Sequence, residues 1–408
     1  MKVAYCSLLL PEEKKLSEKS KERLSGISLH KFTKAVISGL DSNLDEPVKI
    51  FNIINTLNYP KFPQIIFDTE KWNHTKGSED YHIGYINIFG IKYMTQSVNL
   101  YKRLKNWEED LDGEKNVICV HHIYLPSMQA AYWIKKRYKS QVHICLITGD
   151  MNGKYGLASQ YKKNLKSRLT VYLEKRIDKL ATKFDSYVFA TEPMATAFKV
   201  SEKPHVVVEC AYLEPNYKKN VSVMDSEKKI LFYAGAIREE YGIPHLLRSF
   251  EMIESKNYEL RIAGDGNCLP LLKKYAEKDS RIKYLGFITP QEVEENLNET
   301  TIIVSPRIAS NYEFVKYSFP SKTMESLASG KPYIAHKLPC DPPEYDKYIN
   351  YAADESDEAL RNKIVEICNL PLDKRIEIGR NAREFVLQKK NPKIMTKKIV
   401  DMWDKYLY

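Results

Sequence analysis

A short stretch in the second half of the chain, residues 317–330, combines a lysine, hydroxyl groups and a carboxylate where a helix is predicted to start. Its sequence is Tyr-Ser-Phe-Pro-Ser-Lys-Thr-Met-Glu-Ser-Leu-Ala-Ser-Gly. Backbone N–H groups at a helix N-terminus, with Lys322 beside them, are suited to bind a phosphate or diphosphate. Glu325, one turn further along, can accept hydrogen bonds from neighbouring sugar hydroxyls. The stretch therefore indicates a site for a nucleotide sugar.

A glycine-containing turn at residues 235–242 offers a second phosphate ligand. It directly follows the apolar run Ile230 to Ala234. Gly235 allows a ligand to approach the backbone, and the guanidinium of Arg238 can bind two phosphate oxygens. Glycine after a strand is often only a structural turn. The functional interpretation depends on pairing this turn with Lys322 from a later loop.

Two further strand-end turns lie between these segments. Gly264-Asp-Gly266 does not match G-x-G-x-x-G, and no acidic residue follows it at the spacing of a nicotinamide-cofactor site. We interpret this turn as mainly structural and expect no dinucleotide. In the loop Gly286-Phe-Ile288, the backbone is predicted to contact the base of a bound nucleotide.

The first half of the chain alternates short apolar runs with helical patterns. Strands are predicted at 2–10, 48–54, 85–89, 116–120, 142–148, 186–190 and 206–209. Helices are predicted at 29–40, 95–111 and 128–138. This alternation is typical of a doubly wound α/β domain with a parallel sheet.

A polar segment at 214–228 has no periodicity and is predicted to link two domains, because a second alternation follows it. Strands are predicted there at 230–234, 258–263, 282–285, 301–304 and 331–335, and helices at 245–253, 269–277 and 290–298. We expect α/β domains at 1–213 and 225–389, with a C-terminal helix at about 390–408 packing back on the first. Ligands are then expected in a cleft between the carboxyl ends of the two sets of strands.

Composition fits a two-domain protein with a sizeable core. The chain has 408 residues, of which 43% are hydrophobic, and contains no apolar run of about 18 residues. Its seven cysteines form no C-x-x-C pair, so neither a disulfide framework nor a zinc site is indicated. We expect buried thiols and a cytoplasmic protein.

A strongly basic segment runs from Gly153 to Lys183. It contains nine Lys and Arg residues against Glu174 and Asp178, a net charge of +7, and has helical apolar spacing. A basic amphipathic helix of this kind suits peripheral contact with an anionic membrane at its cytoplasmic face. Alternatively, its apolar side packs on the protein core and its lysines are only solvated. The two interpretations are compatible with each other. The sequence contains no known nucleic-acid-binding module, which argues against a nucleic-acid partner.

Polar side chains follow two predicted strands of the first domain. His121 and His122 come after the strand at 116–120, and Asp150 comes after the strand at 142–148. These strand ends are predicted to face the cleft, where a histidine would contact the donor sugar or the acceptor and Asp150 would bind an acceptor hydroxyl. The alternative for both histidines is a hydrogen bond to the backbone at a strand end.

Several stretches occur in an order that resembles a known family. They are "LRIAGDG", "IKYLGFI", "IIVSPR" and "YSFPSKTMESLASGKP". The order is similar to the C-terminal domain of retaining GT-B glycosyltransferases of family 4, in the branch that builds bacterial capsular and other surface polysaccharides. The resemblance covers about Ile230 to Ile349. It implies two Rossmann-like domains facing a cleft and a nucleotide-diphospho-sugar donor.

The family's donor loop carries a Glu-x7-Glu motif. Glu325 matches the second glutamate, which binds ribose, whereas Tyr317 stands where the first would contact the transferred sugar. A tyrosine carries no charge at neutral pH, so the identity of the donor sugar is open. Pro320, Ser321 and Lys322 match the family's diphosphate contact.

The resemblance assigns three further positions. Arg238 matches the basic residue after the first glycine of the second domain, and Tyr241 stands where many relatives have lysine. Lys322 is then expected to supply the missing charge. In the first domain, Gly26 resembles the glycine loop that faces the diphosphate.

The sequence and the resemblance together predict a retaining hexosyltransferase of surface polysaccharide or glycoconjugate biosynthesis. Its acceptor would be a glycan or a polyprenyl-diphosphate-linked sugar. Arg238, Lys322 and His122 form the predicted catalytic set. No metal or other cofactor is expected, because Asp110-Leu-Asp112 precedes a strand and fixed cations can replace the metal. The Tyr317 replacement keeps open a non-catalytic nucleotide-sugar-binding partner of a glycosyltransferase, and an epimerase of the same architecture is a weaker alternative.

Overall fold

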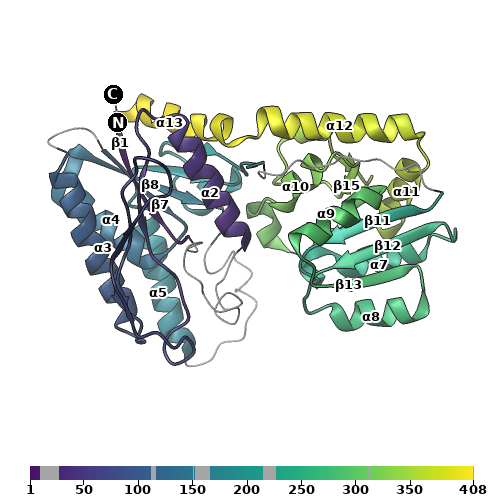
Figure 1. Cartoon of the computed structure of the whole chain (residues 1–408), viewed down its shortest axis with the longest axis horizontal. Coiled ribbons are helices and arrows are strands. Elements are labelled where there is room, and N and C mark those ends of the chain that lie inside the picture. Colours follow the sequence, from purple (N-terminus) through teal and green to yellow (C-terminus); the bar gives the residue numbers. More distant parts are fainter. Residues whose placement is uncertain are drawn as a thin grey trace. The chain divides into compact units, whose positions relative to one another are not determined.

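The computed structural model divides the chain into two compact units, shown in Figure 1. It describes residues 1–9, 27–111, 116–149, 151, 166–214, 227–310 and 312–407. The N-terminal unit comprises Met1–Leu213 and Asn391–Tyr408, and the C-terminal unit comprises Glu214–Lys390. Both are built on parallel sheets covered by helices. The predicted α/β class with two Rossmann-like domains is confirmed.

The N-terminal unit contains an eight-stranded sheet in the order β10-β9-β8-β7-β1-β2-β5-β4. Its strands are β1 (Lys2–Ser7), β2 (Lys49–Asn52), β4 (Glu70–Trp72), β5 (Asp80–His82), β7 (Asn116–His121), β8 (Val142–Thr148), β9 (Ser186–Phe189) and β10 (His205–Val207). All neighbours pair in parallel except β4 and β5. Every residue of β7 and β8 is buried, which explains why both read as continuous apolar runs.

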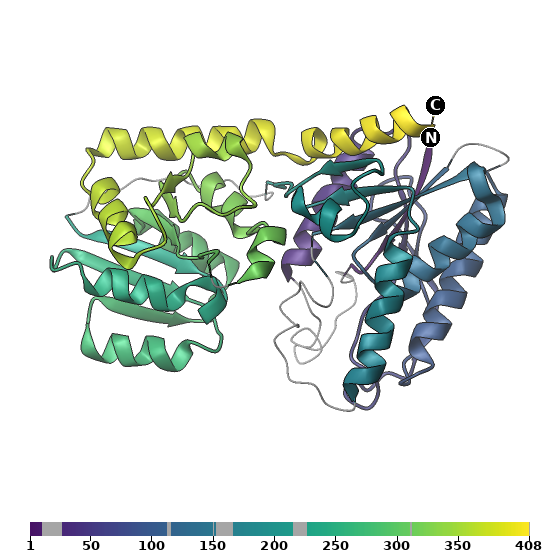
Figure 2. The same cartoon turned by 180° about the vertical axis from the view of Figure 1, so that it is seen from behind.

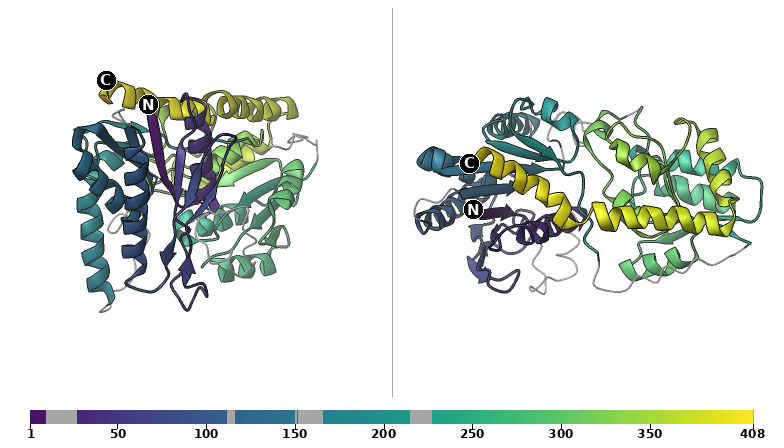
Figure 3. Two further views of the ribbon diagram at one scale, coloured as in Figure 1. Left: turned by 60° about the vertical axis from the view of Figure 1, so that its left-hand side comes forward. Right: turned by 90° about the horizontal axis from the view of Figure 1, so that it is seen from above.

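Helices from both ends of the chain cover this sheet. They are α2 (Ile27–Asp41), α3 (Lys92–Glu109), α4 (Leu125–Tyr138), α5 (Lys166–Ala181), α6 (Pro193–Ala197) and α13 (Pro392–Leu407). The C-terminal helix α13 lies beside α2, as Figure 3 shows. Met395 and Trp403 of α13 belong to the same buried cluster as Leu40 of α2. The last helix therefore completes the core of the N-terminal unit.

One predicted strand of this unit takes a different place. We expected residues 85–89 to join the parallel sheet, but β6 (Tyr85–Ile86) pairs antiparallel with β3 (Ile66–Phe67) in a separate two-stranded sheet. Strand β5 lies beside β2 instead. The pattern of apolar residues does not reveal which strand pairs with which, so this pairing could not be predicted from the sequence.

The C-terminal unit contains a six-stranded parallel sheet in the order β13-β12-β11-β14-β15-β16. Its strands are β11 (Lys229–Ala234), β12 (Tyr258–Ala263), β13 (Ile282–Gly286), β14 (Ile302–Ser305), β15 (Tyr333–Ala335) and β16 (Asn350–Tyr351). The chain runs outward from β11 to β13 and then returns to place β14 on the other side of β11. The loops after β11 and β14 thus leave the sheet at a topological switch point, where ligands bind in such folds.

The helices of the C-terminal unit pack around this sheet, as Figure 2 shows from behind. They are α7 (Ile243–Glu251), α8 (Leu269–Lys278), α9 (Pro290–Glu299), α10 (Lys322–Ala328), α11 (Asp357–Cys368) and α12 (Leu372–Lys389). Helix α10, which carries Lys322 and Glu325, is anchored through its contact with α12.

Two expectations from composition can be compared with the structure. All seven cysteines are buried, as predicted. No helix within the described residues is both long and apolar enough to cross a membrane.

Candidate functional site

The turn after β11 and the loop after β14 touch through their backbones. Gly242 has φ +81°, and a Cβ built on it would lie 1.9 Å from the carbonyl oxygen of Pro306. A side chain at this position would force the two segments apart. The turn that carries Arg238 is therefore fixed against the loop that leads to Lys322.

Arg238 lies at the start of this turn, immediately before the short 3-10 helix η4 (Glu239–Tyr241). Its Nη1 donates a hydrogen bond of 2.9 Å to Oε1 of Glu240, and 40% of the side chain is exposed. Burial alone would raise the pKa of Glu240, but hydrogen bonds from its backbone and from Arg238 lower it. Arg238 therefore forms an ion pair with Glu240, and a bound phosphate would compete with this carboxylate.

The turns after β11 and β12 also meet. Gly264 has φ +134°, and a Cβ there would lie 1.8 Å from the carbonyl oxygen of Gly235. Gly235 donates its backbone N–H to Ala263 over 3.0 Å. This close packing supports a structural role for the Gly264-Asp-Gly266 turn and places Gly235 at the meeting point of the two strand ends.

The predicted donor loop enters α10 through a short 3-10 helix, η5 (Glu313–Tyr317). Tyr317, Pro320 and Glu325 are partly buried, whereas Ser321 and Lys322 are exposed. Because α10 has only seven residues, its dipole is small, and the side chains of Lys322 and Arg238 would provide most of the positive charge.

The loop after β13 lies beyond β12 in the same sheet. Gly286 accepts a 2.8 Å hydrogen bond from the backbone N–H of Gly264, which ties this loop to the turn after β12. Ile288 is partly buried, and Phe287 beside it is 82% exposed. Of the residues predicted to bind the donor in this unit, Gly235 follows β11 and Ile288 follows β13. The others lie in the segment from the end of η5 to the first turn of α10.

In the N-terminal unit, His121 is the last residue of β7 and is fully buried. Its Nδ1 is hydrogen-bonded to the hydroxyl of Tyr5, and its ring meets those of Tyr5 and Phe32 edge to face. Among the residues that the structure describes, its Nε2 has no hydrogen-bond partner. Burial and the neighbouring His122 hold the pKa of His121 well below its usual value, so this imidazole is neutral.

His122 follows in a backbone conformation that non-glycine residues seldom adopt, with φ +75°. Its backbone N–H donates to Ile147 over 2.7 Å, and its Nε2 lies 3.2 Å from the hydroxyl of Thr33 in α2. Burial lowers its pKa to about 3, so His122 is also neutral at physiological pH. It can exchange hydrogen bonds with a sugar, but it supplies no positive charge.

Several sequence-based assignments lie outside the described residues. Gly26 and Asp150 are among them, as is the basic segment up to residue 165. In the described end of α5, Leu180 and Ala181 are buried, whereas Lys175 and Lys179 are exposed. This part of the helix therefore packs on its own unit and carries its charges on the outside.

No group of three His, Cys, Asp or Glu side chains in the described ranges is arranged to hold a metal ion. Asp110 caps the end of α3, and Asp112 falls in the undescribed residues 112–115.

Sequence reasoning missed one charged residue beside the donor loop. Arg307 follows β14 by two residues and lines a small cavity between the ends of β14 and β15. The cavity wall includes Ser305, Pro320, Thr323, His336 and Asp341. The "IIVSPR" stretch places this arginine just after a buried strand, but its spacing does not show that the side chain turns inward.

A family model matches most of the C-terminal unit. Residues 216–385 match the family model described as glycosyl transferases group 1. No curated protein sequence matches the chain.

Solved structures match the chain over nearly its whole length. Sucrose-phosphate synthase from Thermosynechococcus elongatus is 13% identical, with a TM-score of 0.64 and 99% of each chain covered. The lipopolysaccharide outer core galactosyltransferase WaaB is 12% identical, with a TM-score of 0.63 and 99% of each covered. HepE from Anabaena, in complex with UDP, is 12% identical, with a TM-score of 0.61 and coverage of 99% and 100%.

At these identities the structural likeness shows the fold, which is GT-B. The group 1 match and this fold together support a GT-B glycosyltransferase that transfers a sugar.

Proposed function

We propose that the chain transfers a sugar from a nucleotide-diphospho-sugar to a glycan or lipid-linked acceptor, with retention of configuration and without a metal ion. The main observation behind this proposal is that the turn carrying Arg238 contacts the loop that leads to Lys322. Both segments belong to the unit that matches glycosyl transferases group 1. The UDP bound to HepE, a protein of the same fold, supports a nucleotide donor.

In this proposal the chemistry depends on fixed charge. Negative charge grows on the nucleoside diphosphate as it leaves, and cations already in place stabilise that charge more in the transition state than in the ground state. Arg238 and Lys322 supply the cations. Arg238 would exchange its ion pair with Glu240 for one with the phosphate.

The remaining donor contacts are assigned from the positions of the residues in the C-terminal unit. Glu325, in the first turn of α10, would accept hydrogen bonds from the ribose, and the partly buried phenol of Tyr317 would contact the transferred sugar. Pro320 and Ser321 would present the backbone to the diphosphate, with Gly235 at the adjoining turn. The backbone at Ile288 would contact the base.

The remaining proposed contacts are assigned to residues of the N-terminal unit. Neutral His122 would form a hydrogen bond with a sugar hydroxyl, and Gly26 would face the diphosphate. His121 and Asp150 would bind the acceptor. Because Nδ1 of His121 is already engaged by Tyr5, only its Nε2 would be available.

The acceptor is proposed to be a glycan carried on a polyprenyl diphosphate at the cytoplasmic membrane face, in surface polysaccharide synthesis. The basic segment 153–183 supports this location, because its exposed lysines at 175 and 179 would face anionic lipid. WaaB, a protein of the same fold, is a lipopolysaccharide galactosyltransferase, which is consistent with a surface glycan.

A panel of nucleotide-diphospho-sugars tests the proposal. Binding of the correct donor stabilises the folded state, so one or a few donors should raise the melting temperature. The purified chain should then hydrolyse or transfer that donor. If no donor raised the melting temperature, the proposed function would be wrong.

Tyr317 favours a second candidate, a non-catalytic nucleotide-sugar-binding partner of a glycosyltransferase. This candidate predicts donor binding without turnover. Hydrolysis or transfer by the purified chain alone would exclude it. Binding without either reaction, across acceptors, would favour it.

A further inference from the structure

Arg307 is a buried charge with unused hydrogen-bonding capacity. Only 6% of the residue is exposed, and its Nε and Nη2 have no hydrogen-bond partner among the residues that the structure describes. A guanidinium remains protonated in proteins, and buried donors without partners destabilise the folded state. A side chain this costly for stability suggests a role in function.

Asp341 lines the same cavity as Arg307. Asp341 accepts hydrogen bonds from the backbone N–H of Leu338 (3.0 Å) and from the hydroxyl of Tyr351 (3.1 Å). Burial raises the pKa of Asp341 above its usual value, although these hydrogen bonds and the charge of Arg307 act in the opposite direction. The Asp341 carboxylate is therefore already engaged by other donors, and it gives the Nε and Nη2 of Arg307 no hydrogen bond.

Two aromatic rings hold the guanidinium in place. Its Cζ lies 5.6 Å from the ring centre of Tyr241 and 4.9 Å from that of Phe314. Tyr241 belongs to the same turn as Arg238, and Phe314 lies in η5, which ends at Tyr317. Arg307 thus connects the two segments that carry the proposed donor contacts.

The backbone around Arg307 is fixed as well. The turn after β11 contacts Pro306 at Gly242, as described above. On the other side, the carboxylate of Glu355 accepts hydrogen bonds from the backbone N–H groups of Ala309 (2.7 Å) and Ser310 (3.1 Å). The position of the guanidinium is therefore set before any ligand binds.

We propose that Arg307 is a positioning residue of the phosphate site in the C-terminal unit. Its guanidinium lies near Tyr241 of the Arg238 turn and Phe314 of η5, and its buried charge adds positive potential at the strand ends where a nucleoside diphosphate binds. This inference rests on the proposed function. A charge acts over a longer distance inside a protein than in water, so Arg307 needs no direct contact with the phosphates.

The test compares Arg307→Met and Arg307→Lys with the wild-type chain. Methionine fills a similar volume without charge, and lysine keeps the charge but lacks the planar group that stacks on the rings. Binding of nucleoside diphosphates and of the matching nucleosides is measured by calorimetry, together with the melting temperature of each unliganded protein.

Arg307→Met should weaken nucleoside diphosphate binding about tenfold, because a fixed positive charge near the phosphates is lost. Nucleoside binding should be unchanged. The unliganded melting temperature should be unchanged or higher, because an apolar side chain replaces a poorly compensated buried charge. Arg307→Lys should bind nucleoside diphosphates with intermediate affinity.

A double variant makes the test stricter. Because the ring of Tyr241 covers the guanidinium from the Arg238 turn, Tyr241→Lys places a new charge on that same turn. Combined with Arg307→Met, it should recover part of the lost diphosphate affinity.

Three outcomes would overturn the inference. One is wild-type diphosphate affinity in Arg307→Met. Another is a lower melting temperature or failure to fold, which would make Arg307 a structural residue. The third is an equal loss of nucleoside and nucleoside diphosphate binding. If the wild-type chain binds no nucleoside diphosphate at all, the proposed function itself fails and this inference fails with it.

Discussion

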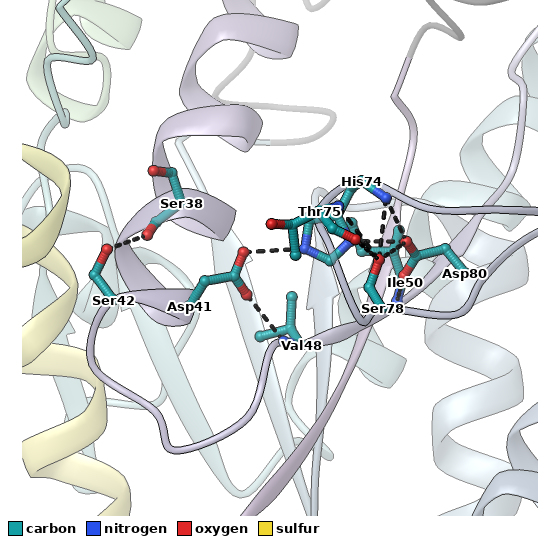
Figure 4. A network of polar contacts seen from close by, with 9 residues as sticks. All are labelled: Ser38, Asp41, Ser42, Val48, Ile50, His74, Thr75, Ser78 and Asp80. Atoms are coloured by element: carbon teal, nitrogen blue, oxygen red, sulfur yellow. Dashed lines mark hydrogen bonds and ion pairs between the residues drawn. The ribbon is translucent and has the colours of Figure 1, made fainter.

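The protonation state of an ionisable side chain in this protein depends on its surroundings. His74 in the N-terminal unit is an example. Its Nδ1 lies 2.7 Å from Oδ2 of Asp80, and its Nε2 lies 3.0 Å from Oδ2 of Asp41 (Figure 4). Asp80 also accepts hydrogen bonds from the hydroxyl of Ser78 and the backbone N–H of Ile50. The imidazole thus connects the end of α2 to the hairpin of β4 and β5.

This arrangement predicts a pH-dependent stability. Burial alone would lower the pKa of His74, but the hydrogen bonds with Asp41 and Asp80 raise it to about 9. A folded-state pKa above the unfolded value stabilises the fold fully below about pH 6.5, and this stabilisation is lost as the pH rises towards about 9. The melting temperature should fall over that interval, by about 2–4 °C for each kcal/mol lost.

Replacement of the imidazole checks the assignment. His74→Gln keeps hydrogen-bonding capacity but does not titrate, so this part of the pH dependence should disappear. His205→Gln serves as a matched control, since His205 approaches Glu192, which is largely exposed. An unchanged pH profile in His74→Gln would contradict the account.

At the scale of elements, the loops of the C-terminal unit are positioned by strand order and backbone contacts. The switch point between β11 and β14 brings the Arg238 turn beside the loop that leads to α10. Glu355, far along the chain, holds that loop through Ala309 and Ser310. Burial alone would raise the pKa of Glu355, but hydrogen bonds from Ser310 and Ala309 lower it, so the carboxylate is ionised.

Loss of this carboxylate should affect both stability and binding. Glu355→Ala leaves two backbone N–H groups without their acceptor, which costs about 1–3 kcal/mol for each group that stays buried. Denaturant unfolding should show this loss, and donor affinity should fall because the loop is less ordered. Glu277→Ala, at an exposed position of α8, is the control. Equal stability of the two variants would show that Glu355 does not hold the loop.

Much of the element pattern could be predicted from the sequence, because buried parallel strands are short apolar runs. The run at 142–148 coincides with β8, and that at 258–263 coincides with β12. Strand pairing could be predicted less well from the sequence. β6 lies outside the main sheet because non-local contacts determine its partner strand. The two-residue strand β16 has too few residues to show a period.

The candidate site could be predicted only in part. The sequence indicates Arg238 and Lys322 because each lies in a polar turn or loop after an apolar run. The structure places Arg238 in the turn after β11 and Lys322 at the start of α10. It does not indicate Arg307, because arginine is usually exposed and only tertiary packing turns this one inward. The neutral state of His122 likewise results from burial, which no spacing reveals.

At the scale of the whole molecule, the chain builds two units and uses its last helix in the first of them. Trp403 of α13 is fully buried in the core that also contains Tyr5, the partner of His121. The stability of the N-terminal unit therefore depends on residues that follow the C-terminal unit in the sequence.

Truncation of this tryptophan should reveal the dependence. Trp403→Ala should destabilise the N-terminal unit by about 3–5 kcal/mol, the usual range for a buried aromatic side chain. Calorimetry should show a lower unfolding temperature for the N-terminal unit. Nucleotide binding should still raise the unfolding temperature of the C-terminal unit. Tyr406→Ala is the control on the same helix, because Tyr406 is 52% exposed. A shift confined to the C-terminal unit would contradict the assignment of α13.

We propose that two cations of the C-terminal unit, Arg238 in the turn after β11 and Lys322 at the start of α10, stabilise a leaving nucleoside diphosphate. Initial rates of sugar transfer or donor hydrolysis test it most directly in Arg238→Ala and Lys322→Ala, with Lys274→Ala on the exposed side of α8 as the charge-matched control. We expect a loss of roughly 10²–10³-fold in each site variant, the scale of removing one charge-stabilising donor, and wild-type rates in the control. Wild-type rates in both site variants would contradict it.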